Sequence, residues 1–193
     1  MLTNSRLNKM MELLNKDNDY KLTSQTFTIN CNINNDENWG CKTAYNYTEL
    51  IIQPKFNKKI FTIDFLGYLI NEYGLDKDYV NYDYDTCITI LVLLHEYSHS
   101  HRYNNMTEYE YYDYRIKADI DYKEYYKEMK RKYTIGEYNS YEAEIKYRRL
   151  PNESYADRTA VEIFNRYGLQ LLSIFKGKAK KQIRLELSRM NNQ

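Results

Sequence analysis

The chain is organised around residues 87–103, which read CITILVLLHEYSHSHRY. The segment 88–94 is apolar on nearly every face, which predicts a helix that is buried on all sides. His95 and His99 are four residues apart, so on a helix both imidazoles leave the same face one turn apart. That spacing suits two nitrogen ligands of one zinc ion. Glu96 lies about 100° further round the helix, where it can accept a proton from a water at the metal.

The third ligand of this site cannot be a histidine. Hydrolytic zinc sites use three protein ligands and keep one position for water. The chain has three histidines, and the remaining one, His101, lies about 200° round the helix from His99. We therefore predict His101 to be a surface or hydrogen-bonded histidine, and the third ligand to be a carboxylate or a cysteine. Cys87 is excluded because it lies about 12 Å away along the same helix. The plain alternative to a metal site is a pair of hydrogen-bonded histidines at the end of a core helix.

The best carboxylates lie in residues 151–161, PNESYADRTAV. Pro151 followed by Asn152 as N-cap favours the start of a helix here. Glu153 and Asp157 then lie at positions i and i+4 on one face. One carboxylate can bind the metal, while the other accepts a hydrogen bond from the far nitrogen of a ligand histidine. The alternative is an ordinary helix N-terminus, where acidic residues are favoured by the helix dipole.

Together, His95-Glu96-x-x-His99 and Asn152-Glu153-x-x-Ala156-Asp157 resemble the motifs of the gluzincins, a clan of zinc peptidases. Within that clan the short chain, the strand-like segment 49–54 and the Glu-x-x-Ala pattern are similar to the ImmA/IrrE-type metallopeptidases. The resemblance implies a zincin-like domain with Zn²⁺ bound by His95, His99 and Glu153. It also implies that Glu96 is the general base and that Asp157 supports a ligand from outside the metal's coordination sphere.

Several alternatives remain open at this point. The 54 residues from His99 to Glu153 (153 − 99) exceed the separation in compact members, which predicts a Tyr-rich helical insertion over residues 104–150. Acids in that insertion are alternative ligands: Glu108, Glu110 and Asp119. Peptide deformylases combine the same histidine motif with an upstream cysteine, for which Cys41 is a faint match. The other motifs of that family are missing, and the metzincin pattern would need a further histidine downstream.

Composition and charge restrict the function classes. The chain has 193 residues and a net charge of +1, which favours one domain and gives no general attraction to nucleic acid or membrane. No apolar run approaches the ~18 residues of a membrane span, and the N-terminus has no apolar signal core. Three cysteines without a paired framework predict free thiols and a cytoplasmic location. One basic cluster near the C-terminus comprises Lys176, Lys178, Lys180, Lys181, Arg184 and Arg189.

The remaining pattern predicts an α+β fold, with a small antiparallel sheet packed on a mostly helical body. Strands are predicted over 21–33 and 43–53, as antiparallel neighbours around a turn at 34–40. The second strand is a candidate sheet edge along which a peptide substrate lies extended; the alternative is a plain structural strand. Helices are predicted over 2–16, 60–73, 107–133, 137–149 and 153–167, with a polar turn at 76–85 and a last helix from 169.

These observations predict a zinc-dependent peptidase that hydrolyses a peptide bond. The resemblance implies that its substrate is one regulatory protein, such as a transcriptional repressor. A tyrosine is expected to stabilise the developing oxyanion. The alternative is a non-catalytic, zinc-containing module that binds another protein through its tyrosine-rich helices. Nucleic acid is disfavoured as a partner, because segment 108–133 carries seven acids against seven bases.

Overall fold

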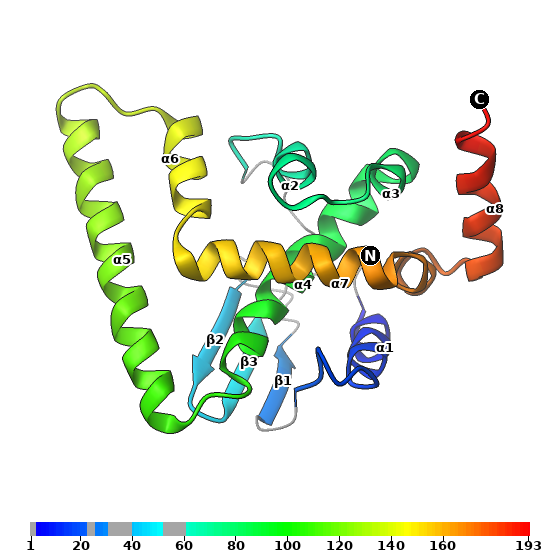
Figure 1. Cartoon of the computed structure of the whole chain (residues 1–193), viewed down its shortest axis with the longest axis horizontal. Coiled ribbons are helices and arrows are strands. Elements are labelled where there is room, and N and C mark those ends of the chain that lie inside the picture. Colours follow the sequence, from blue (N-terminus) through cyan, green and yellow to red (C-terminus); the bar gives the residue numbers. More distant parts are fainter. Residues whose placement is uncertain (1–2, 23–25, 31–39, 52–60) are drawn as a thin grey trace.

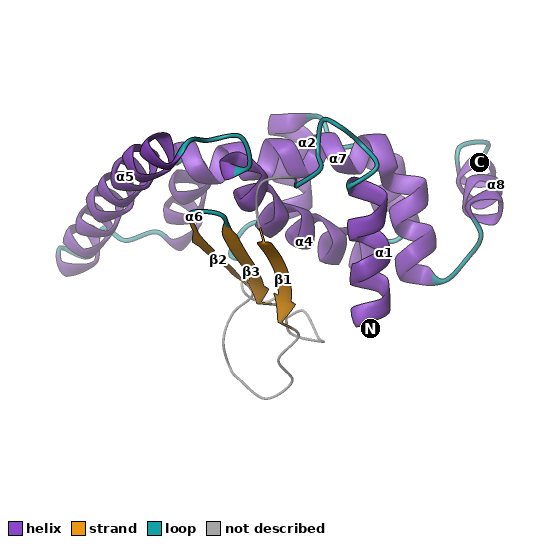
Figure 2. Ribbon diagram, turned by 90° about the horizontal axis from the view of Figure 1, so that it is seen from below, coloured by secondary structure: helices purple, strands orange, loops and turns teal. Residues whose placement is uncertain are grey.

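The computed structural model describes residues 3–22, 26–30, 40–51 and 61–193 of the chain. Helices form most of the molecule, and one small sheet lies against them (Figures 1 and 2). In chain order the elements are α1 (Asn4–Leu14), β1 (Thr26–Asn30), β2 (Gly40–Ala44), β3 (Tyr47–Ile51), α2 (Phe65–Tyr73), α3 (Lys77–Tyr82), α4 (Tyr84–Tyr103), α5 (Glu108–Thr134), α6 (Ser140–Arg148), α7 (Pro151–Lys176) and α8 (Lys180–Met190).

The sheet is mixed, so the predicted α+β class with an antiparallel sheet is wrong. Strand order is β1-β3-β2, with β2 antiparallel to β3 and β1 parallel to β3. The single strand predicted over 43–53 is in fact the end of β2, a two-residue turn and β3. Asn46 makes that turn possible at φ 58°, a left-handed conformation that asparagine tolerates. The extra strand adds a second reversal of direction, so β3 runs parallel to β1. The fold is a helical body that carries a small mixed sheet.

Parts of the strand predictions lie outside the described residues. These are the predicted turn at 34–40 up to residue 39, the end of the first predicted strand at 31–33, and the end of the second at 52–53.

Helix α4 is the central element of the body. It packs most extensively on α7, and the sheet contacts it through β2 and β3 (Figure 1). Its segment from Ile88 to His95 is buried almost continuously, with Thr89 the half-buried exception, which confirms the predicted all-round burial. Helices α1, α2, α3 and α8 add apolar side chains to the same core. Because α4 and α7 pack along each other, residues near the end of one meet residues near the start of the other.

Helix α7 is longer than predicted and starts differently. Its N-cap is Leu150 with Pro151 in the first turn, so Asn152 lies inside the helix and is not its cap. The helix also continues through Gly168 and ends at Gly177, which has φ 71°. A Cβ on Gly168 would lie 2.7 Å from Cε2 of Tyr79. Gly168 is therefore a close-packing residue under the Tyr79 ring, and the predicted helix end there is wrong.

Helices α5 and α6 lie in the segment 104–150 and fold back on each other as predicted. Thr107 and Glu110 form a reciprocal capping box at the start of α5. The two helices share a small apolar cluster, separate from the main core, of Tyr125, Met129 and Ala143 with Tyr147 and Leu150 against it. Helical spacing predicts an inward-facing stripe on α5 made of Tyr111, Tyr114, Ala118, Tyr122, Tyr125, Met129 and Tyr133. Tyr133 is the exception, since it is 76% exposed. The hairpin lies at one end of the molecule and returns the chain to α7 (Figure 1).

Smaller differences concern element boundaries. Helix α2 starts five residues later than predicted because Asp64 caps it, accepting a hydrogen bond from the Gly67 nitrogen at 3.2 Å. It ends at Tyr73 as predicted, with Gly74 as its C-cap at φ 69°. The predicted polar turn at 76–85 contains the short helix α3, capped by Asp76. Within the described ranges, no helix combines the length and apolarity needed to cross a lipid bilayer.

Asp83 caps α4 and links it to α7, so its contribution to stability can be tested by substitution. Asp83 Oδ1 accepts a hydrogen bond from the Thr86 nitrogen at 3.1 Å, and Oδ2 pairs with Lys176 Nζ of α7 at 2.5 Å. Replacing Asp83 with alanine should lower the free energy of unfolding by about 1–2 kcal/mol in urea denaturation at pH 7. Asp83→Asn, which keeps the cap and loses the ion pair, should lose less. An Asp83→Ala protein as stable as wild type would contradict this role.

The same residue predicts a pH dependence. Burial raises the pKa of Asp83, but the hydrogen bonds from Lys176 and Thr86 outweigh it and lower that pKa below its usual 3.8. The stability that the ionised carboxylate contributes is therefore fully present above pH 3.8 and is lost as the pH falls through the lowered value. The difference between wild type and Asp83→Asn should close in acid. A difference that stays constant down to pH 2 would contradict the assignment.

Candidate metal centre

Two histidines of α4 and one glutamate of α7 converge on one point inside the body. Nε2 of His95 lies 3.1 Å from Nε2 of His99 and 3.3 Å from Oε2 of Glu153. Nε2 of His99 lies 3.8 Å from Oε1 of Glu153. The side chains of His95, His99 and Glu153 are only 7%, 12% and 4% exposed. The tertiary structure thus brings the three predicted ligands together, although Glu153 lies 54 residues after His99 in the sequence (153 − 99).

This donor set fits a zinc ion. Its ligand atoms all lie within 4.8 Å of one another. Zinc bonds of about 2.0–2.1 Å in tetrahedral geometry place ligand atoms roughly 3.3–3.4 Å apart, close to the separations seen here. Two imidazoles and one carboxylate are also a known ligand combination for catalytic zinc, with a fourth position left for water. Among the described residues, His95, His99 and Glu153 form the one group of histidine, cysteine or acidic side chains whose geometry could hold a metal ion.

Asp157 fixes the orientation of His95. Nδ1 of His95 donates a hydrogen bond to Oδ1 of Asp157 at 2.7 Å, which leaves Nε2 facing the centre. The Asp157 side chain is fully buried, and Arg148 Nη1 donates to the same oxygen at 3.3 Å. The Arg148 guanidinium in turn lies 4.6 Å over the ring of Phe65. Asp157 therefore occupies the supporting position that the sequence predicted, and Arg148 is a contact that the sequence did not reveal.

The three side chains of the centre shift one another's pKa values. Burial lowers the pKa of His95, but attraction to Asp157 and hydrogen bonds to Asp157 and Glu153 outweigh it and raise that pKa to about 10. Burial and the neighbouring charge of His95 lower the pKa of His99. Although burial opposes it, the pairing with His95 and His99 lowers the pKa of Glu153 well below its usual range. These shifts favour a carboxylate at Glu153 and a neutral imidazole at His99, and binding of a cation would require Nε2 of His95 to give up its proton.

Glu96 lies beside the centre without being part of the ligand cluster. It is half-buried, whereas His95 and Glu153 are buried. Its negative charge is among those that act on His99 and raise the pKa of that imidazole. These facts agree with the predicted position of Glu96, next to His95 and on a different side of α4.

Helix α5 supplies a tyrosine to the centre. The Tyr122 hydroxyl donates a short hydrogen bond to Oε1 of Glu153. It accepts one from Nδ2 of Asn152 at 2.9 Å, and Oδ1 of Asn152 accepts one from the Tyr114 hydroxyl at 2.9 Å. Burial and the charge of Glu153 raise the pKa of Tyr122, so its hydroxyl keeps the proton that it donates. The sequence predicts Tyr114 and Tyr122 only as members of a core-facing stripe. Their spacing of about two helical turns places both hydroxyls on one face of α5, which is the feature that could have indicated a shared partner.

The alternative ligands lie elsewhere. Glu108, Glu110 and Asp119 are exposed, and Glu110 is used in the capping box of α5. His101 is hydrogen-bonded to the Tyr155 hydroxyl at 3.0 Å and to the Asp19 carbonyl at 2.7 Å, which confirms the prediction of a satisfied histidine. Cys87 is buried, and its thiol donates to the Tyr79 carbonyl at 3.1 Å. Cys41 lies in β2, and its side chain is outside the described part.

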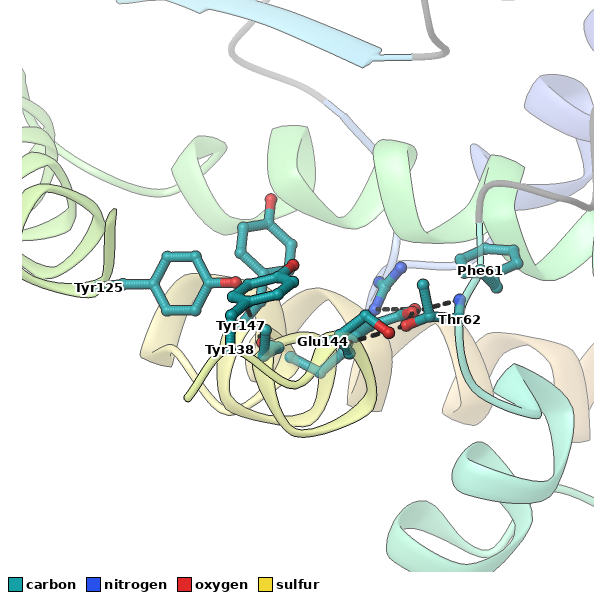
Figure 3. Close-up of a pocket in the computed structure, with 9 residues that line it drawn as sticks. Phe61, Thr62, Tyr125, Tyr138, Glu144 and Tyr147 are labelled. Carbon is teal, nitrogen blue, oxygen red and sulfur yellow. Dashed lines mark hydrogen bonds and ion pairs between the residues drawn. The ribbon is translucent and has the colours of Figure 1, made fainter. Parts of the chain in front are cut away.

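An open cavity of about 270 Å³ lies between α6 and the segment before α2 (Figure 3). Aromatic rings form much of its wall, and Glu144 accepts hydrogen bonds from the nitrogen and hydroxyl of Thr62 at 2.6 and 2.5 Å. Arg148 lines the cavity and also contacts Asp157. The lining residues are Phe61, Thr62, Tyr125, Tyr138, Ser140, Ala143, Glu144, Tyr147 and Arg148.

Comparison with known proteins adds no relative. No protein-family model, no curated protein and no solved structure matches this chain. The resemblance to gluzincins and to ImmA/IrrE-type metallopeptidases therefore stays a prediction that rests on two short motifs.

Proposed function

We propose that the protein is a zinc-dependent peptidase. The observation that carries this proposal is the convergence of His95, His99 and Glu153, with separations suited to zinc, beside a further acid on α4. A structural zinc site is normally closed by four protein ligands and has no need of a general base. Three ligands with Glu96 next to them are the arrangement of a hydrolytic centre. The substrate class, a protein or peptide, is part of the proposal.

The chain's own residues have separate roles in this reaction. His95, His99 and Glu153 would hold the ion, which supplies the Lewis acidity for activating water and polarising a carbonyl. Glu96 would take a proton from the attacking water and deliver it to the leaving amine as the C–N bond breaks. Asp157 keeps the proton of His95 on Nδ1, and Arg148 keeps Asp157 in place.

Two features of the described part of the chain suit an extended peptide. Strand β2 lies at one edge of the sheet and packs on α4, whereas β3 has a neighbour on each side. The predicted substrate-binding edge is therefore better assigned to β2 than to the strand over 47–51. The cavity beside α6 has room for one large side chain, with tyrosine rings around it (Figure 3). A regulatory protein such as a repressor remains the proposed substrate, and a cytoplasmic location remains a prediction.

Metal removal tests the proposal directly. The full chain, purified without added metal, is expected to contain about one zinc per molecule. It should also produce new amino termini in a mixture of random-sequence peptides. Treatment with a chelator should remove both the zinc and the cleavage, and added zinc should restore them. A protein that contains no zinc and takes none up would contradict the metal site. Zinc without cleavage of any peptide would favour the second candidate.

The second candidate is a non-catalytic module that binds another protein. It is favoured by the outer face of α5, where apolar side chains are exposed to water: Tyr109 81%, Tyr112 53%, Ile116 61% and Ile120 49%. The basic cluster gives less support to an acidic partner, because part of it is already paired. Lys176 binds Asp83, and Lys178 binds Glu186. Glu96 has no role in such a module, so its substitution distinguishes the two candidates.

A further inference from the structure

We infer that Tyr122 is a positioning residue for Glu153: its hydroxyl holds one carboxylate oxygen and leaves the other oxygen to the metal ion. This inference rests on the metal site of the proposed function and does not depend on peptidase activity. It also assigns a role to the α5–α6 hairpin, since α5 carries Tyr122 to the centre.

The first support is that the direction of the hydrogen bonds is determined. Tyr114 donates its hydroxyl proton to Oδ1 of Asn152, so the amide must present its nitrogen to Tyr122. The Tyr122 oxygen accepts that N–H, and its single proton goes to Oε1 of Glu153. A lone tyrosine could rotate its hydroxyl away from the carboxylate. Here the amide of Asn152 disfavours that rotation, because the donor would then lose its partner in a half-buried site.

The second support is the geometry of α5. Tyr114, Ala118 and Tyr122 are four residues apart and share one face of the helix. Ala118 is 7% exposed, so this face is covered at its middle position. The hydroxyls of the two tyrosines meet the two ends of one amide, that of Asn152 on α7. The α5 face and the first turn of α7 are thus fitted to each other next to Glu153.

The third support is the difference between the two carboxylate oxygens. Oε2 of Glu153 pairs with Nε2 of His95 at 3.3 Å, whereas Oε1 carries the hydrogen bond from Tyr122. A carboxylate with one oxygen held by a hydrogen bond favours binding a cation through the other. If Tyr122 loses its hydroxyl, a buried oxygen is left without that donor, and it can turn toward the ion as a second ligand. The expected consequence is a weaker site with a different coordination number.

The test compares Tyr122→Phe with Tyr126→Phe in the full chain. Tyr126 lies one turn further along α5 and is 59% exposed, so it controls for the loss of a phenol hydroxyl from this helix. Zinc affinity is measured by competition with a chelator at fixed pH, and the visible spectrum is recorded with cobalt(II) in place of zinc. Tyr122→Phe should bind zinc about 10–100-fold more weakly. Its cobalt spectrum should lose intensity as coordination expands, because geometry determines these bands.

Further variants separate positioning from simple destabilisation. Asn152→Ala should weaken zinc binding less than Tyr122→Phe, since the tyrosine keeps its own proton. Tyr126→Phe should match wild type in both affinity and spectrum. Unchanged affinity and spectrum in Tyr122→Phe would overturn the inference. So would an affinity loss with an unchanged cobalt spectrum. A wild-type chain that binds neither ion would overturn the metal site and this inference together, whereas zinc binding without peptide cleavage would affect only the proposed activity.

Discussion

Replacing Glu96 with glutamine is expected to lower kcat/KM for peptide hydrolysis by about 10²–10⁴-fold, the usual contribution of a general base. Glutamine has nearly the same shape and cannot accept the proton. Zinc content should stay at the wild-type level, because Glu96 lies outside the cluster of His95, His99 and Glu153. The measurement is cleavage of the same peptide mixture by protein of known zinc content.

A matched control for Glu96→Gln is Glu162→Gln on α7, where the side chain is exposed. That variant should retain wild-type activity and zinc. Full hydrolysis by Glu96→Gln at equal zinc content would show that another residue takes the proton. Loss of zinc along with activity would instead assign Glu96 a structural part in the site, and the mechanism would have to be revised.

Replacing Glu153 should have the largest effect on metal binding. Glu153→Gln keeps the size of the side chain and an oxygen for the Tyr122 hydroxyl, but it removes the negative charge at the centre. Zinc affinity should fall by more than the roughly 10–100-fold typical of residues that only support a ligand. The measurement is the same chelator competition, with folding checked by thermal unfolding of the metal-free proteins.

The controls for Glu153 are the other acids that sequence spacing left open as ligands. Glu108→Gln and Asp119→Asn change exposed side chains and should bind zinc like wild type. His99→Ala should lose zinc as Glu153→Gln does. Wild-type affinity in Glu153→Gln would move the third ligand elsewhere and would also remove the basis for assigning Tyr122 a positioning role.

Near the centre, some features follow from local sequence pattern and others do not. Burial of α4, the capping box of α5 and the return through α6 follow from periodicity and capping residues, which act within a few turns. The two wrong predictions about α7 arose where a residue type has two uses. Gly168 can end a helix or admit a close neighbour. It does the latter here, because the Tyr79 ring packs against it. Asn152 can cap a helix or bridge side chains, and its two tyrosine partners come from α5, which ends 17 residues before α7 begins (151 − 134).

By itself, the sequence was enough to predict the histidine pair on one helical face, the acid beside it and the pair of carboxylates at the start of α7. These are relations within single helices, where the 3.6-residue repeat determines which side chains are neighbours. Only the tertiary structure decided that Glu153 meets the histidines and that Asp157 meets His95. It alone decided that Arg148 and Tyr122 complete their surroundings and that β1 runs parallel to β3. These contacts depend on how separate elements pack, a free energy summed over the whole core that no short motif contains.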